Sequence, residues 1–255
     1  MRVLVTGGRG FLGTHVCEAL LAAGHEPLPL GRADGDLAEA GTIERLLDTH
    51  APEAVVHLAA VMPGDERIAQ NAPIAGAVAS ACAARALPLF HGSTTAVYFD
   101  ETPYADSKRE SEELADGATI LRFHHPYGPG QRRGAIPTML RQALAGEPVV
   151  AYGGWLRSFC FARDAAEAVA VLVGRGERGD WDIGRDDDLR TLEEVAHLAC
   201  AAAGADESLV ELAEPPEGYT AVLEELDTER LRSLGWRPSV DLEEGLRRTL
   251  ESLRA

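Results

Sequence analysis

The chain of 255 residues has few aromatic residues and no long apolar run, and a strand-like segment begins at once without a charged leader. Aromatic residues make up 5% of the sequence, and alanine carries much of its apolar content. No apolar stretch approaches the ~18 residues that a membrane-spanning helix requires. These absences predict a cytoplasmic globular protein that does not enter a membrane.

Cysteine is scarce as well. The four thiols are scattered and show no paired spacing; they are Cys17, Cys82, Cys160 and Cys200. Zinc sites and disulfide frameworks are built from characteristically spaced cysteines, so we expect neither here. The sequence predicts four buried thiols and no metal.

Positive charge is limited too, with 24 Lys and Arg against 41 Asp and Glu and a formal net charge of -17. Nucleic acid and anionic membrane surfaces are bound through positive charge, so neither is an expected partner. A phosphate-bearing ligand must therefore meet a local basic cluster.

Short apolar runs alternate with helix-like segments through the first half of the chain, which is typical of a parallel sheet with helices on both faces. Strands are expected over residues 2–6, 26–30, 54–58, 89–93 and 118–123. Helices are expected over residues 12–23, 42–49, 68–86 and 104–115. The pattern predicts an α/β fold with a doubly wound parallel sheet.

The rhythm changes after Phe123, where prolines and glycines precede a helical stretch over residues 136–145. A strand over residues 181–183 and helices over 191–203 and 242–253 follow. We predict a dinucleotide-binding domain over residues 1–124, with 158–185 returning to it. Residues 125–157 and 186–255 are predicted to form a small substrate-binding lobe.

The first strand runs directly into the glycine-rich turn Gly7-Gly8-Arg9-Gly10-Phe11-Leu12-Gly13. Gly7 suits a tight turn, Gly10 lets the backbone approach a pyrophosphate, and Gly13 lets the next helix pack on the strand. Free N–H groups at the start of that helix then point at the anion. This context predicts a dinucleotide site.

The residues after the second strand determine whether NAD or NADP is preferred. An acidic side chain there binds the ribose 2′-hydroxyl of NAD, whereas arginine accommodates the 2′-phosphate of NADP. Here the strand ends in Leu30-Gly31-Arg32. We expect Arg32 and Arg9 to form a basic clamp that favours NADP(H), with NAD(H) possible; the alternative is that both are ordinary surface arginines.

Tyr104 and Lys108 stand four residues apart on an expected helix and therefore on one face. A tyrosine of pKa ~10 needs about 4 kcal/mol of phenolate stabilisation to reach a pKa of ~7, and a nearby ammonium helps to supply it. The hydroxyls of Thr94 and Thr95 follow the fourth strand, where the active sites of parallel sheets collect. Together these residues indicate acid–base chemistry.

The chain resembles the extended short-chain dehydrogenase/reductase family, also called NAD-dependent epimerase/dehydratases, over nearly its whole length. Beyond the glycine loop, the segments that carry the resemblance are Val56 to Ala60, Ser93 to Tyr98, Tyr104 to Lys108, Leu121 to Gly130, Arg157 to Asp164, and Gly235 to Leu246. The resemblance implies that Thr94, Tyr104 and Lys108 are catalytic, with Tyr104 as the acid/base and Lys108 as its modulator and the ribose anchor.

The resemblance also implies a nucleotide-linked sugar as substrate and a homodimer joined through residues 68–86 and 104–115. The predicted cofactor-binding residues are Gly7, Arg9, Gly10, Phe11, Leu12, Gly13, Arg32, Asp36, Leu37, Leu58, Ala59, Ala60, Tyr104 and Lys108. The predicted substrate-binding residues are Thr94, Thr95, His125 and Arg157, with Arg132 and Arg133 as weaker candidates for the diphosphate.

Three departures from the family pattern limit the chemistry. Sugar dehydratases carry Asp-Glu where this chain has Thr95 and Ala96, and epimerases that use a thiol carry cysteine in place of Thr95. The asparagine expected before Tyr127 is replaced by the His124-His125-Pro126 run, so His125 becomes a candidate to bind the sugar. Only residues 99–103 separate Tyr98 from Tyr104, whereas the family inserts a long loop there. The missing loop implies a more open pocket, a different substrate or reduced activity.

These observations favour a ketoreductase in which NADPH delivers hydride to a keto group, with a nucleotide-linked deoxysugar as the expected substrate. The alternative enzyme is a redox-neutral epimerase that retains NAD. A third possibility is a non-catalytic NAD(P)-binding sensor or scaffold, against which the retention of Thr94, Tyr104 and Lys108 speaks.

Overall fold

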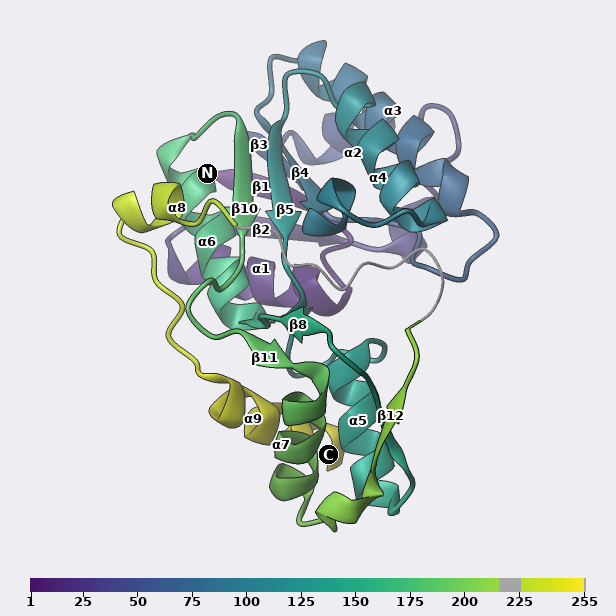
Figure 1. The fold of residues 1–255 in the computed structure, drawn as a ribbon. Coiled ribbons are helices and arrows are strands. Elements are labelled where there is room, and N and C mark those ends of the chain that lie inside the picture. The colour runs from purple at the N-terminus through teal and green to yellow at the C-terminus, as the bar shows by residue number, and fades with distance from the viewer. Residues whose placement is uncertain (216–225, 255) are drawn as a thin grey trace.

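The computed structural model describes residues 1–215 and 226–254 and centres on a parallel six-stranded sheet (Figure 1). Its strands are β1 (Arg2–Thr6), β2 (Glu26–Leu30), β3 (Ala54–His57), β4 (Leu89–Thr94), β5 (Thr119–Phe123) and β10 (Asp180–Ile183). Their order is β10-β5-β4-β3-β1-β2, so the chain moves outward from β1 to β2 and then crosses back to β3. Ligands of open α/β sheets bind at such a reversal, beyond the carboxyl ends of the strands.

Helices cover both faces of this sheet (Figure 1). Helices α1 (Phe11–Ala22) and α6 (Ala162–Arg175) pack on one face, and α2 (Thr42–His50), α3 (Asn71–Ala83) and α4 (Pro103–Leu114) cover the other. Each face of the sheet has its own apolar core. Alternate residues of a strand belong to opposite cores, because successive side chains point to opposite faces. Val3 and Val5 thus join the core beside α1, and Leu4 joins the core beside α2. The doubly wound α/β fold predicted from the sequence is confirmed.

Strand β2 forms one edge of the sheet, and two prolines blunt it. The N–H of Glu26 donates to the carbonyl of Met1 at 2.8 Å, so the alternate residues of β2 point their N–H groups towards β1. Positions 27 and 29, which point outward, are both proline. They offer a further strand no N–H donor, which protects the edge from pairing with another chain.

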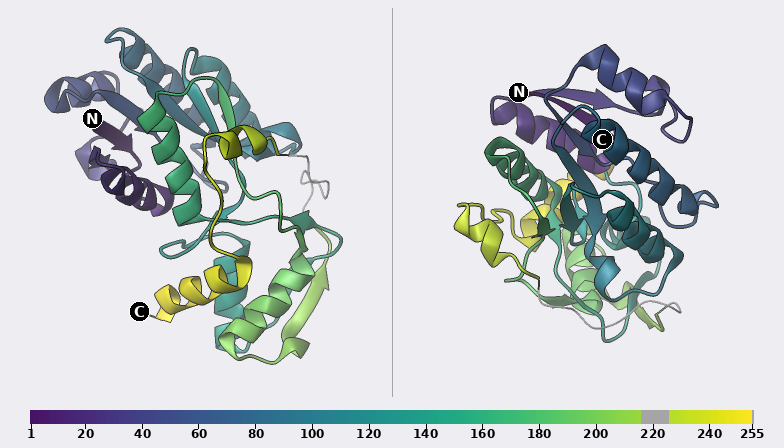
Figure 2. Two further views of the ribbon diagram at one scale, coloured as in Figure 1. Left: turned by 90° about the vertical axis from the view of Figure 1, so that its left-hand side faces the viewer. Right: turned by 90° about the horizontal axis from the view of Figure 1, so that it is seen from above.

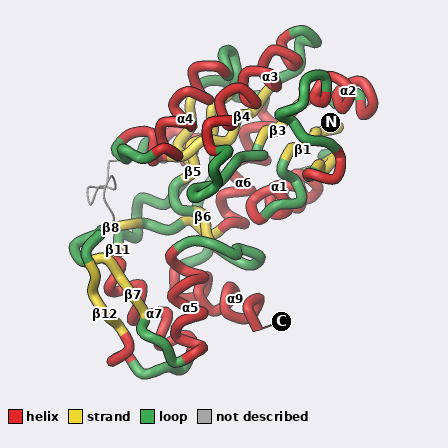
Figure 3. Tube along the Cα trace, turned by 90° about the vertical axis from the view of Figure 1, so that its right-hand side faces the viewer, coloured by secondary structure: helices red, strands yellow, loops and turns green. Residues whose placement is uncertain are grey.

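A separate group of elements lies beyond the sheet, at the bottom of Figure 3. It contains α5 (Ala135–Ala145), α7 (Leu192–Ala203) and α9 (Leu242–Arg254), with β7 (Val149–Tyr152) and β12 (Val210–Ala213) as a parallel pair. These elements share one apolar core that includes Leu140, Val195 and Leu246. The left view of Figure 2 shows this lobe below the sheet. Two short strand pairs lie at the junction, where Figure 3 labels β6, β8 and β11; they are β6 (Pro126–Tyr127) with β9 (Cys160–Phe161), and β8 (Leu156–Arg157) with β11 (Arg190–Thr191).

The remaining elements are short. Helix α8 (Glu229–Ser233) lies against β10, where Arg230 stacks on the Trp181 ring with its guanidinium carbon 3.6 Å from the ring centroid. Single 3-10 turns span Arg32–Asp34, Ile68–Gln70, Thr95–Tyr98 and Glu207–Leu209. Across the residues that the structure describes, no helix is both long and apolar enough to cross a membrane.

The elements expected from sequence recur with small shifts. The helix expected over residues 68–86 begins as a 3-10 turn and becomes α3 at Asn71, whose side chain bonds both the N–H and the carbonyl of Val61. Helix α6 and strands β7 and β12 lie outside the expected elements. The division into residues 1–124 plus 158–185 and a second lobe stays a prediction.

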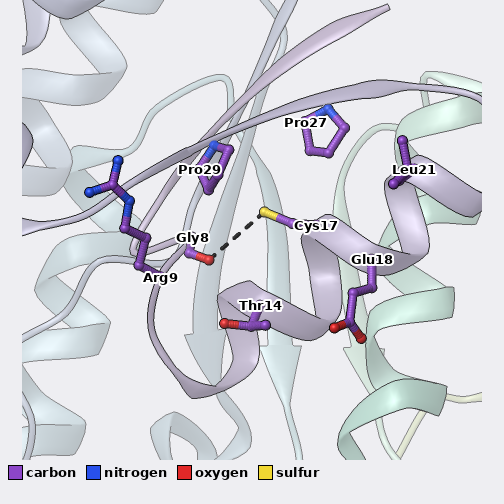
Figure 4. Close-up of a pocket in the computed structure, with 8 residues that line it drawn as sticks. All are labelled: Gly8, Arg9, Thr14, Cys17, Glu18, Leu21, Pro27 and Pro29. Atoms are coloured by element: carbon purple, nitrogen blue, oxygen red, sulfur yellow. Dashed lines mark hydrogen bonds between the residues drawn. The ribbon is translucent and has the colours of Figure 1, made fainter.

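The expectation of four buried thiols is wrong for Cys17. Cys82, Cys160 and Cys200 are buried, but Cys17 is only partly buried. It lines a surface hollow of about 440 Å³ between α1 and β2, opposite Pro27 and Pro29 (Figure 4).

Asp164 on α6 is fully buried and holds the chain segment that leads to α9. Its carboxylate accepts hydrogen bonds from the Ser239 N–H, the Ser239 hydroxyl and the Val240 N–H, at 3.0, 2.8 and 3.0 Å. Asp164→Ala is expected to lower the free energy of unfolding by about 3 kcal/mol, because it leaves buried donors without a partner. Chemical denaturation measures this loss.

The matched control is Glu167→Ala on the same helix, which breaks only a partly exposed pair with Arg163. That pair is worth about 0.5 kcal/mol. Equal losses in the two variants would contradict the assignment of Asp164 as the anchor of this segment.

Candidate active site

The glycine turn after β1 is shaped by close backbone contacts. Gly7 has a φ of 69°, and a Cβ there would lie 2.8 Å from the Ala59 nitrogen. A Cβ at Gly13 would lie 2.1 Å from the Gly7 carbonyl oxygen, so α1 could not begin so close to the turn. Gly7, Gly13 and Ala59 are therefore brought together as the sequence predicts, in a turn that only glycine fits.

The start of α1 is open towards a ligand. Gly10 is its N-cap and supplies no side-chain cap, and the first turn carries no acidic residue. A Cβ at Gly10 would meet only the Gly7 oxygen, at 3.1 Å, so the space beyond it is not filled by protein. Unpaired N–H groups and the helix dipole at this end suit a pyrophosphate, and the turn thus fits a dinucleotide.

Arg9 and Arg32 do not form a joint clamp in the structure. Arg9 packs over Gly31 and pairs with Asp34 at 3.3 Å, and Asp34 also accepts the Gly31 N–H at 2.8 Å. Arg32 begins the next 3-10 turn and is exposed. Asp36 accepts the N–H of Ala38, and Leu37 reaches the core beside α2.

The residues predicted to be catalytic lie at the carboxyl end of β4 and the start of α4. Thr94 ends β4 and caps the turn Thr95–Tyr98, since its hydroxyl oxygen accepts the Ala96 N–H at 3.2 Å. The hydroxyl proton of Thr94 stays available for a ligand. Tyr104 stands in the first turn of α4, after the N-cap Thr102 and Pro103.

Burial raises the pKa of Tyr104 to about 12 and keeps its hydroxyl protonated at neutral pH. The expectation that Lys108 lowers this pKa towards neutrality is wrong for the protein without cofactor, because burial disfavours the phenolate. Among the described residues, no hydrogen bond ties that hydroxyl to another side chain. Tyr104 is therefore free to donate its proton to a ligand.

Lys108 is 3% exposed, and its Nζ donates to the Gly92 carbonyl of β4 at 2.6 Å. Burial lowers the pKa of Lys108 to about 8, while the charge of Glu112 acts in the opposite direction. Its ammonium is thus fixed two residues before Thr94 and one helical turn after Tyr104. The geometry brings these three residues to one edge of the sheet.

The short connection before α4 is tied down by Arg109. Its guanidinium donates to the carbonyls of Val97 and Asp100, at 2.7 and 2.6 Å. Asn71 of α3 holds the other side of the helix through the Ser107 hydroxyl at 3.1 Å. These contacts fix α4 against β4 and thereby position Tyr104 and Lys108.

A buried polar cluster lies beside Thr94. The Thr95 hydroxyl and His124 Nδ1 are 2.8 Å apart, and the His124 and His125 rings meet edge to face at 4.5 Å. Among residues 1–215 and 226–254, His124 Nε2, His125 Nε2 and the Ser158 hydroxyl are buried and have no hydrogen-bond partner. His125 also adopts a φ of 39°, which is uncommon for a residue other than glycine.

Both histidines of this cluster are neutral. Burial, assisted by the charge of Arg157, lowers the pKa of His124 to about 3 and that of His125 well below its usual range. Arg157 itself is 3% exposed and stacks on Trp155 with its guanidinium carbon 4.4 Å from the ring centroid. The structure therefore brings Thr95, His125 and Arg157 together around His124, and their role in substrate binding stays a prediction. His124 and Ser158 are additions that sequence reasoning missed.

Arg132 and Arg133 are exposed on the loop before α5, and the Arg132 carbonyl accepts from Arg141 at 2.8 Å. Nothing places them with Arg157. Across residues 1–215 and 226–254, no group of three His, Cys, Asp or Glu side chains is arranged to hold a metal ion.

A family model described as the NAD dependent epimerase/dehydratase family matches residues 3–184. The chain belongs to this family. The match spans the glycine turn, the Tyr104–Lys108 pair and the polar cluster at His124 and His125. This epimerase/dehydratase-family member is thus an enzyme of the extended short-chain dehydrogenase/reductase type.

Its relatives are nucleotide-sugar enzymes. A dTDP-glucose 4,6-dehydratase of Xanthomonas campestris pv. campestris (strain B100) is 27% identical, with 97% of this chain and 92% of the relative covered. The structure of the Thermus thermophilus UDP-glucose 4-epimerase in complex with NAD matches at a TM-score of 0.89 and 27% identity, covering 100% of this chain and 99% of that one. The dTDP-glucose 4,6-dehydratase DesIV of Streptomyces venezuelae, solved with NAD, matches at a TM-score of 0.89 and 26% identity, covering 100% and 97%.

The chain is shorter than the Xanthomonas dehydratase. Their alignment spans 323 positions, whereas this chain has 255 residues, so at least 68 positions are gaps on its side. The short connection before Tyr104 accords with this difference.

Cofactor binding is expected to weaken as pH rises through about 8, because deprotonation of Lys108 would remove the ammonium that the family resemblance assigns to the cofactor ribose. NADPH fluorescence titrations from about pH 6 to about pH 10 measure the midpoint. The Lys108→Met variant should bind NADPH weakly at every pH. It should therefore lack the alkaline limb, that is, the loss of affinity as pH rises. A wild-type affinity that stays constant over that range would contradict the role of Lys108.

Proposed function

We propose that this enzyme is a ketoreductase that prefers NADP(H) and reduces a keto group of a nucleotide-linked sugar. The observation that carries the proposal is the Thr94, Tyr104 and Lys108 arrangement followed by Thr95 and Ala96. Reduction of a ketone needs one proton donor and one oxygen-binding group, and this arrangement supplies both. Elimination of water needs a further acid and base after Thr94, and those positions carry no carboxylate.

In the proposed reaction the Tyr104 hydroxyl donates its proton to the carbonyl oxygen, while the Thr94 hydroxyl donates a hydrogen bond that holds this oxygen. The bound nicotinamide cofactor would supply the hydride. Burial alone raises the pKa of Tyr104 to about 12, so its hydroxyl is protonated at neutral pH, and the positive charge of the bound cofactor together with Lys108 would have to lower this pKa for efficient proton transfer. The Lys108 ammonium then stabilises the phenolate until it regains a proton from solvent.

The preference for NADP(H) rests on the end of β2. Gly31 stands where an acidic side chain would select NAD, and Arg9 packs over it with Arg32 next along the chain. The Arg9–Asp34 pair is partly exposed and worth at most about 1 kcal/mol, so a 2′-phosphate can displace Asp34 from Arg9.

The proposed substrate follows from the polar cluster and from the relatives. Arg157 would bind the diphosphate, and the neutral donors and acceptors of Thr95 and His125 would bind sugar hydroxyls. The names of the relatives, dTDP-glucose 4,6-dehydratase and UDP-glucose 4-epimerase, indicate this class of substrate. We also propose a cytoplasmic homodimer joined through residues 68–86 and 104–115, which sedimentation at micromolar concentration tests.

A redox-neutral epimerase with retained NAD is the second candidate. It is favoured by the NAD bound in the Thermus thermophilus epimerase structure and by Asp34, whose carboxylate lies beside the end of β2. An epimerase would keep its cofactor through purification, whereas a reductase must exchange it at each turnover.

The purified enzyme is expected to oxidise NADPH when supplied with a nucleotide-linked keto sugar, and Tyr104→Phe should lower the rate by about 100-fold or more, because it removes the proton donor. Absorbance of the reduced nicotinamide measures turnover with NADPH and with NADH. Two results together would contradict a reductase and favour the epimerase. They are that no keto sugar of the panel stimulates oxidation of NADPH or of NADH, and that the purified protein retains NAD.

Arg32→Asp is expected to weaken NADPH binding at least about 10-fold and to leave NADH binding equal or tighter, because a carboxylate repels the 2′-phosphate and accepts the 2′-hydroxyl. Arg45→Ala serves as a nearby control, since Arg45 contacts the Asp34 carbonyl. Unchanged NADPH affinity in Arg32→Asp would overturn the proposed preference.

A further inference from the structure

Glu112 and Arg122 form an ion pair near Lys108 that is less exposed and has more hydrogen bonds than a typical surface ion pair. Glu112 follows Lys108 by one helical turn on α4, and its side chain is 14% exposed. Arg122 of β5 donates to both of its oxygens, from Nε at 3.0 and 3.1 Å and from Nη2 at 2.6 Å. The Ser93 hydroxyl adds a third donor at 2.5 Å.

Two successive residues of β4 hold the two opposite charges of α4. The Gly92 carbonyl accepts the Lys108 ammonium, and the Ser93 side chain donates to the Glu112 carboxylate. Residues four apart on a helix are neighbours, and here both are also pinned to adjacent points of the sheet. The carboxylate is thereby kept at a fixed distance from the ammonium.

Two described histidines, His57 and His91, interact with the charge of Lys108 and are neutral at neutral pH. Burial lowers the pKa of His57 on β3 to about 3 and that of His91 on β4 well below its usual range, and the charge of Lys108 acts on both in the same direction. Tyr104 on α4 is protonated at neutral pH. The field at the ammonium therefore depends on Glu112 and on how far Arg122 compensates it.

We propose that Glu112 and Arg122 act together as positioning residues that set the charge of Lys108 and hold its ammonium on Gly92. The pairing with Arg122 offsets part of the carboxylate charge, so Glu112 supports the Lys108 ammonium without fixing it permanently in the charged state. Asp180 and the Tyr98 hydroxyl hold the far side of the Arg122 guanidinium, at 2.7 and 2.9 Å. This inference rests on the cofactor-binding role of Lys108 in the proposed function.

Two single substitutions should move Lys108 in opposite directions. Glu112→Gln removes the negative charge and keeps the shape of the side chain, so the midpoint of the alkaline limb should fall by roughly half to one pH unit. Arg122→Gln leaves the carboxylate uncompensated beside Lys108, so the midpoint should rise by a similar amount. A merely structural role would change stability without producing shifts of opposite sign.

The measurement is the pH dependence of NADPH and NADH binding by nicotinamide fluorescence, with thermal unfolding of each variant alongside. Asp180→Asn is the matched control, because it removes a carboxylate from Arg122 but leaves the Arg122–Glu112 contact; its midpoint should match the wild type. If Arg122→Gln does not fold, the other two variants still decide the proposal. The binding midpoint should then be lower in Glu112→Gln than in the wild type and unchanged in Asp180→Asn.

Opposite shifts in the two variants would support the inference. Midpoints that stay together, or that move in the same direction in Glu112→Gln and Arg122→Gln, would overturn it. A wild-type protein that binds neither cofactor at any pH would overturn the proposed function itself, and this inference with it. Because binding is read without a sugar substrate, a failed choice of substrate cannot produce either negative result.

Discussion

The buried ammonium of Lys108 is the constraint around which the rest of the site is arranged. A charge removed from water costs several kcal/mol unless protein groups replace the solvent, and here the Gly92 carbonyl and the field of Glu112 do so. That geometry requires α4 to lie close against β4. Thr102 and Pro103 start the helix at the right residue, and the Asn71–Ser107 contact keeps it in place. Tyr104 is positioned by the same packing.

The sheet forms the other half of the site, where close contacts between backbone segments are again required. The β1 turn, the Leu58–Ala60 segment after β3 and the end of β4 all lie at the carboxyl edge of neighbouring parallel strands. Glycine at position 7 lets the first two touch. A dinucleotide that crosses this edge from the start of α1 would run towards Tyr104, which is why one fold can bind the cofactor and hold the acid.

The parts of this arrangement that depend on local sequence could be predicted, and those that depend on strand register could not. The glycine turn and the Tyr104–Lys108 spacing are contained within single segments, so their placement follows from the period of one helix or turn. The Thr95–His124 and Glu112–Arg122 contacts join β4 or α4 to β5, and they require the register that pairs Thr94 with Phe123. Arg9 likewise meets Asp34 only because β2 lies beside β1. Cys17 lies in a hollow beside the edge strand β2, and which strand forms the edge is a property of the whole sheet.

The proposed net reduction at Thr94, Tyr104 and Lys108 can be tested with NADPH that carries deuterium at the transferable nicotinamide position. After incubation with the enzyme and a nucleotide-linked keto sugar, the recovered sugar is analysed by mass spectrometry. A reductase places one deuterium on carbon in the product for each NADPH oxidised, and Tyr104→Phe should lose this transfer. A sugar whose configuration changes while NADPH is neither consumed nor its label transferred would contradict a reductase and identify a redox-neutral epimerase.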